Sequence, residues 1–103
     1  MGLPLVCDLT GMDRTQRQRH HLLVQQRRHA VDVMETLPDG YRFRFEPSDE
    51  LWLVLAEFVT FERRCCPFVE FTLTLKHDHG PMWLRLTGRE GVRQLLQSEL
   101  ELI

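Results

Sequence analysis

The strongest constraint on the fold is a helix that is apolar on nearly every side. Over residues 51–61 the only polar side chains are Glu57 and Thr60. Ser48 precedes this run as a helix N-cap, and acidic residues follow it in the first turn, where the helix dipole favours them. A helix without a broad polar face has to be covered on most sides. We therefore predict a helix over residues 48–65 that is either central to the domain or half of a dimer interface.

Three other segments alternate between apolar and polar residues, which is typical of half-buried strands. In the first of them Tyr41, Phe43 and Phe45 face one way and charged residues the other. The last two form an antiparallel hairpin across the turn at His77 to Pro81. The predicted strands cover residues 41–46, 68–76 and 82–87, and the Pro-containing segment 3–7 is a candidate edge strand or ordered arm.

A polar-then-apolar segment before the first strand predicts another helix, with Thr10 as its N-cap and Asp13 as an acidic partner. With the final helix, the predicted helices cover residues 11–35, 48–65 and 88–102. The order (β)αβαββα favours a single two-layer α+β domain over residues 1–103. Its sheet has three or four antiparallel or mixed strands, with helices packed on one face.

Composition is that of a globular protein. Charged residues make up 27% of the 103 residues, and the formal net charge is −2, which argues against nucleic acid as a partner on bulk charge. No apolar run reaches the roughly 18–20 residues that a membrane span needs, and the N-terminal residues do not resemble a secretory signal. We therefore expect a cytoplasmic protein whose thiols are reduced.

Three cysteines are the most informative residues for function. Cys65 and Cys66 are adjacent where the central helix ends and Pro67 stops it, and Cys7 comes just before the first helix. Such junctions between elements tend to meet at the end of a sheet. Thiolates prefer soft ions such as Cu(I), Zn(II) or a heavy metal, so we predict a thiophilic metal site formed by Cys7, Cys65 and Cys66. Candidate fourth ligands are Asp8, Glu62, His77 and His79.

The alternative is that the cysteines are structural, because cysteine is among the most buried residue types. Cys65 continues the helical spacing of Leu51, Leu55 and Phe58, as a core residue does. A vicinal disulfide between Cys65 and Cys66 is a further alternative. A nucleophilic cysteine paired with a histidine has no supporting spacing here, so an enzyme is the weaker hypothesis.

Two other features suggest partners. The first thirty residues hold five arginines against two aspartates, so the first helix is basic. An interaction module that uses Arg14, Arg17 and Arg19 towards an acidic partner is the second functional hypothesis, although a solvated basic face is the simpler interpretation. The apolar central helix predicts a homodimer in which Trp52 is a contact. Trp52 and Trp83 are expected to be core or interface anchors, and Glu62 and Glu70 surface carboxylates.

The segment Glu62-Arg63-Arg64-Cys65-Cys66-Pro67-Phe68 resembles a family of small uncharacterised bacterial proteins with an E-R-x-C-C-P-F motif. The similarity extends to Cys7 before Leu9-Thr10 and to the Leu-Pro-Asp-Gly-Tyr run at 37–41. It covers most of the chain. The resemblance implies a shared sequence pattern and transfers no activity.

Overall fold

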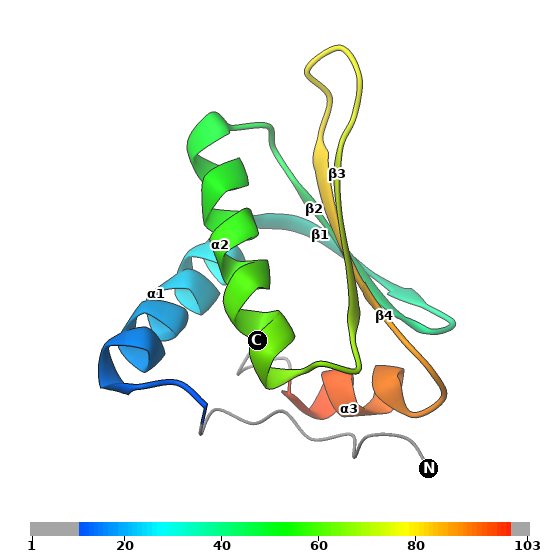
Figure 1. Ribbon diagram of the computed structural model, residues 1–103. Coiled ribbons are helices and arrows are strands. Elements are labelled where there is room, and N and C mark those ends of the chain that lie inside the picture. Colours follow the sequence, from blue (N-terminus) through cyan, green and yellow to red (C-terminus); the bar gives the residue numbers. More distant parts are fainter. Residues whose placement is uncertain (1–10, 100–103) are drawn as a thin grey trace.

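The computed structural model describes residues 11–99, and these form an α+β fold with one antiparallel sheet (Figure 1). The sheet order is β1-β2-β4-β3, and α1 and α2 lie side by side on one side of it. The predicted fold class is confirmed. The elements are α1 Arg14–Ala30, β1 Val31–Leu37, β2 Gly40–Phe45, α2 Asp49–Cys65, β3 Glu70–Leu75, β4 Met82–Thr87 and α3 Val92–Glu99.

Strand β1 corrects the prediction of a helix over residues 11–35, since α1 ends at Ala30. Val31 is extended, with φ −64° and ψ 129°, and the chain turns directly into the strand. β1 pairs antiparallel with β2, with Leu37 opposite Gly40, so only two residues connect them. The two connecting residues are Pro38 and Asp39, and both residue types are common in turns. The β-branched residues of 31–37 can then pair with β2, and this pairing stabilises the segment more than a continuation of α1 would.

The hydrophobic core lies between the sheet and the two long helices, α1 and α2. Tyr41, Phe43 and Phe45 all point into it, as their alternation predicts. Leu55 and Phe58 of α2 meet them and are 0% exposed. The central helix is therefore covered along one face by the sheet and by α1 (Figure 1).

Gly40 is required where β2 begins. A Cβ atom at this position would lie 1.9 Å from the carbonyl oxygen of Leu86 on β4. Only glycine allows the two backbones to approach this closely. The β1–β2 turn and the β2–β4 register therefore depend on the same residue.

The helix ends also differ in detail from the prediction. The N-cap of α1 is Asp13, whose carboxylate accepts from Gln16 N–H at 2.8 Å while the Gln16 side chain accepts from Asp13 N–H at 3.0 Å. Because this capping box already satisfies the first turn, α1 begins after Asp13. Helix α3 begins at Val92 instead of residue 88. The candidate strand 3–7 and Thr10 lie outside the described residues.

Within residues 11–99, the helices are too short or too polar to cross a membrane.

Candidate thiol site at the end of helix α2

Cys65 and Cys66 both lie inside the core, each with 1% of its surface exposed. Cys65 ends α2, and Cys66 leaves it with φ −126° and ψ 68°. The backbone of Cys66 is held on both sides, because its N–H donates to Glu62 O at 2.7 Å and its carbonyl accepts from Val69 N–H at 3.1 Å. The two adjacent sulfurs are thus placed by a fixed turn at the helix end.

A buried carboxylate–imidazole pair lies beside these sulfurs. Glu62, one turn before Cys66, contacts Nε2 of His20 on α1 through Oε1, and the two side chains are 1% and 5% exposed. The other carboxylate oxygen, Oε2, lies 3.8 Å from Cys66 Sγ. The Glu62 carboxylate therefore lies between the His20 imidazole of α1 and the Cys66 sulfur at the end of α2.

Arg27 completes this group, which we call the buried polar cluster: His20, Arg27 and Glu62. Its guanidinium carbon lies 5.0 Å from the Phe43 ring centroid and 5.4 Å from that of Phe58. Burial lowers the pKa of Arg27 to about 10, against the attraction of Glu62. Three ionisable side chains therefore share the apolar space between α1, α2 and the sheet.

Burial also shifts the proton equilibrium of Glu62. Its pKa is raised above the ordinary 4.5, because desolvation outweighs the hydrogen bond from His20 and the attraction of His20 and Arg27. The carboxylate is consequently a better proton acceptor than a carboxylate in water. Its Oε2 lies within 3.8 Å of Cys66 Sγ.

Glu62 was expected on the surface, and that expectation is wrong. Its spacing from Leu55, Phe58 and Cys65 is helical, so it shares their buried face. The same periodicity that predicted a buried Cys65 was therefore the signal for Glu62. His20, on the apolar stripe of α1, is buried as its spacing indicates.

The two cysteines differ in their covalent state. Cys66 is disulfide-bonded, whereas Cys65 carries a thiol. A vicinal disulfide between them, one of the alternatives from the sequence, is therefore absent from the described residues. The disulfide also differs from the reduced state that we expected for these thiols.

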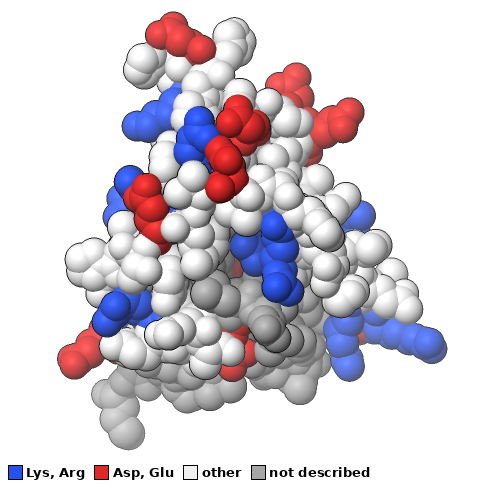
Figure 2. Space-filling view, turned by 180° about the vertical axis from the view of Figure 1, so that it is seen from behind, with Lys and Arg blue, Asp and Glu red and all other residues white. Residues whose placement is uncertain are grey.

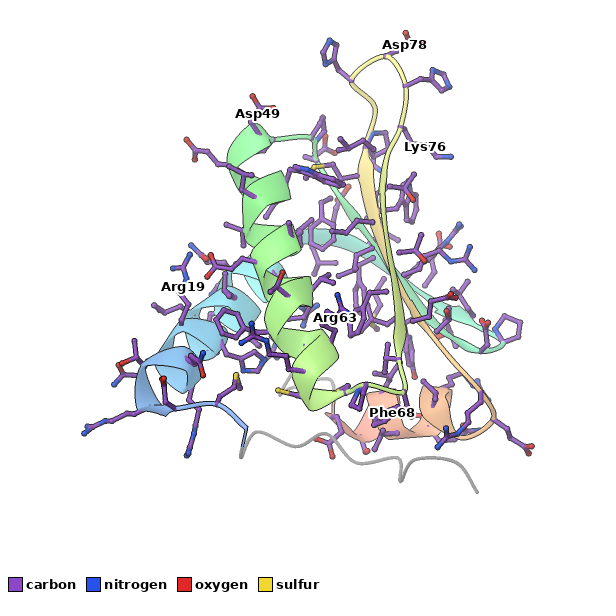
Figure 3. The ribbon with its side chains drawn as sticks, viewed as in Figure 1. Arg19, Asp49, Arg63, Phe68, Lys76 and Asp78 are labelled. Carbon is purple, nitrogen blue, oxygen red and sulfur yellow. The ribbon has the colours of Figure 1, made fainter. Side chains whose placement is uncertain are left out.

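The other predicted ligands are not brought to this site. Cys7 and Asp8 lie outside the described residues. His77 and His79 flank Asp78 at the tip of the β3–β4 hairpin, at the opposite end of the molecule from Arg63 and Phe68 (Figure 3). Within residues 11–99 no group of three or more His, Cys, Asp or Glu side chains is arranged to hold a metal ion. The two hairpin histidines are therefore excluded as ligands beside Cys65 and Cys66.

Part of the basic face predicted for α1 forms contacts within the domain. Both guanidinium nitrogens Nε and Nη2 of Arg19 donate to Glu57 of α2, at 2.6 and 2.7 Å. This pairing raises the pKa of Arg19 and lowers that of Glu57. Arg27 is buried, as described above. On the face shown in Figure 2, basic and acidic side chains are interspersed instead of forming a field of one sign.

Trp83 is not a core residue. It lies on the face of the sheet that the helices leave open, where Arg42 stacks on it at 4.6 Å from guanidinium carbon to ring centroid. Met82 and Leu84, on either side of Trp83 in β4, point into the core. Trp52 is partly buried against the core.

Comparison with known proteins adds no further constraint, because no family model, no curated protein and no solved structure matches this chain.

Proposed function

We propose that the protein binds a thiophilic metal ion, such as Cu(I), Zn(II) or a heavy metal, through the thiolates of Cys7, Cys65 and Cys66. One observation carries the proposal: two adjacent buried sulfurs end α2 beside a buried carboxylate–imidazole pair. Burying ionisable groups costs free energy, and a purely structural thiol does not require them. The chain's third cysteine, Cys7, is the natural source of a further thiolate.

The buried polar cluster supplies what metal binding at a buried thiol needs. A thiol loses its proton when it ligates a metal ion, so the proton has to reach an acceptor. Glu62, with its raised pKa and its Oε2 at 3.8 Å from Cys66 Sγ, is that acceptor, and His20 is next along the same path. The end of α2 disfavours a thiolate because the helix dipole is negative there. Arg63 and Arg64 in the last turn offset this effect.

The disulfide at Cys66 suggests that the site is open only in the reduced protein. A disulfide sulfur has no thiolate to offer a metal ion. A cellular dithiol that reduces the bond supplies two electrons and two protons and leaves two thiols, while the dithiol itself becomes a disulfide. Metal ions then displace the thiol protons. The protein would act as a reversible carrier or sensor whose metal site depends on redox state.

Metal titration of the fully reduced protein tests the proposal. Protein reduced with a phosphine, which leaves no competing thiol, is titrated with Cu(I) or Hg(II) while thiols and protons released are counted. We expect one ion per chain and clearly weaker binding in Cys65→Ser and Cys66→Ser, because soft ions prefer thiolate ligands to hydroxyls. The oxidised protein should not bind.

Two matched variants separate the proton acceptor from a general charge effect. Glu62→Gln should weaken binding most above the pKa of Glu62, where the wild-type carboxylate is ionised and can accept the proton, whereas Glu57→Gln on the exposed face of α2 should leave binding unchanged. Equal binding by wild type and a variant lacking all three cysteines would contradict the proposal. So would a fully reduced, folded protein that takes up no ion.

The alternative function is an interaction module based on α1. It is favoured by an open hollow of about 590 Å³ lined by Arg14, Arg17, Gln18, His21 and Leu22. Arg14→Glu is the clean test, because reversing Arg19 also breaks its pair with Glu57. If Arg14→Glu no longer binds an acidic partner while Cys66→Ser still does, the result would favour the interaction module over metal binding.

We also propose a homodimer through the outer face of α2. Leu53 on this face is 68% exposed, and Trp52 beside it is only partly covered. Light scattering at micromolar concentration should give twice the 12.3 kDa chain mass, and Leu53→Glu should give the monomer. A wild-type protein that scatters as 12.3 kDa rejects the dimer.

A further inference from the structure

The open face of the sheet carries a basic hollow on the side away from Cys65 and Cys66. Five described residues line a cavity of about 210 Å³: Arg42, Thr74, Lys76, Trp83 and Arg85. None of the five is acidic. The sheet separates this hollow from α2, and Lys76 extends away from that helix (Figure 3).

Strand register brings these side chains together. Arg85 on β4 lies directly opposite Arg42 on β2, and Thr74 on β3 lies opposite Trp83 on β4. Lys76 follows β3 immediately and stands on the same side as Thr74. Three cations, a hydroxyl and an indole ring thus converge from three neighbouring strands.

The charges in the hollow are only partly balanced. Arg42 pairs with Glu35 on β1 and stacks on Trp83, so its guanidinium is held in place. Arg85 and Lys76 form no ion pair with any residue of the described range 11–99. Two like charges directly opposite each other on neighbouring strands are unfavourable, so Arg42 and Arg85 repel each other. An anion between them removes that repulsion.

We propose that this hollow binds a small organic anion through a phosphate or carboxylate group. The planar fork of an arginine donates two parallel hydrogen bonds to such an oxyanion, and a lysine adds a point charge. In this arrangement Arg85 and Lys76 contact the anionic group and Thr74 donates its hydroxyl hydrogen. Arg42, fixed by Glu35 and Trp83, contributes charge from the opposite side. The volume admits a small ligand and excludes a folded partner.

Binding is tested by titrating isotope-labelled protein with inorganic phosphate, a nucleoside monophosphate and citrate, and following backbone amides by NMR. Saturable shifts at Thr74, Trp83 and Arg85 are expected for at least one of them. The monophosphate binding more tightly than phosphate assigns an organic phosphate, and citrate binding best assigns a carboxylate. Because Cys65 and Cys66 lie on the other side of the sheet, Cys66→Ser should bind these anions normally.

Matched charge removals decide whether the hollow is the site. Arg85→Gln and Lys76→Gln should each weaken binding about tenfold or more, as loss of a charge-assisted contact predicts. Arg28→Gln removes the same charge from an exposed position of α1 and should change nothing. Equal weakening in all three variants, or shifts away from the hollow, would overturn the proposal. So would the absence of saturable binding of every probe up to about 10 mM.

Discussion

The energetic coupling between His20 and Glu62 can be measured directly. Besides the carboxylate, Glu62→Ala removes one buried methylene, about 0.8 kcal/mol. It also leaves His20 and Arg27 without their carboxylate, which costs about 1–3 kcal/mol more. The expected loss in the free energy of unfolding is therefore about 2–4 kcal/mol, which overlaps the range of about 3–5 kcal/mol found when one member of a buried pair is removed. That is a large part of the stability of a domain this size.

A double-mutant cycle isolates the pair from the lost packing. Glu62→Ala, His20→Ala and the double variant are unfolded in urea at pH 7 and followed by tryptophan fluorescence. The double variant should lose less than the sum of the single losses, with a coupling of about 1–3 kcal/mol. If Glu62→Ala does not fold, Glu62→Gln keeps the shape and takes its place in the cycle. A coupling below about 0.5 kcal/mol would refute the assignment of a stabilising buried pair.

Three further predictions concern single positions. Asp13→Ala should lower the free energy of unfolding by about 1 kcal/mol, measured in urea, because the capping box of α1 is lost. Gly40→Ala should cost at least about 3 kcal/mol or prevent folding, seen by circular dichroism, because the added methyl group meets the carbonyl of Leu86 at 1.9 Å. Burial raises the folded pKa of Glu62 above 4.5, so its proton is held more tightly in the folded protein. The stability that protonation of Glu62 contributes should be fully present below pH 4.5 and lost as pH rises through the folded pKa, and Glu62→Gln should remove this pH dependence from the urea-midpoint profile.

The fold was predictable where a single periodicity applied. The alternation of Tyr41, Phe43 and Phe45 has no helical interpretation, and these residues form β2 with their rings inward. Residues 31–37 were different. Val31 and Met34 fit the helical stripe that includes Val24, while the β-branched residues of the segment fit a strand. The deciding information was the two-residue connection before Gly40, which lies outside the segment itself.

The candidate site shows a different limit of the sequence. Helical spacing placed Glu62 on the same buried face as Phe58 and Cys65, yet the cost of burying a carboxylate argued for the surface. The cost is offset by His20 and Arg27, which come from another helix 42 and 35 residues away in the chain. Their spacing on α1 marks an inward face but does not indicate which residue of α2 they meet. That register is fixed by how α1 and α2 pack on the sheet. A buried ionisable group predicted from periodicity alone therefore implies an opposite charge on a neighbouring element, and here that inference would have led from Glu62 to the basic residues of α1.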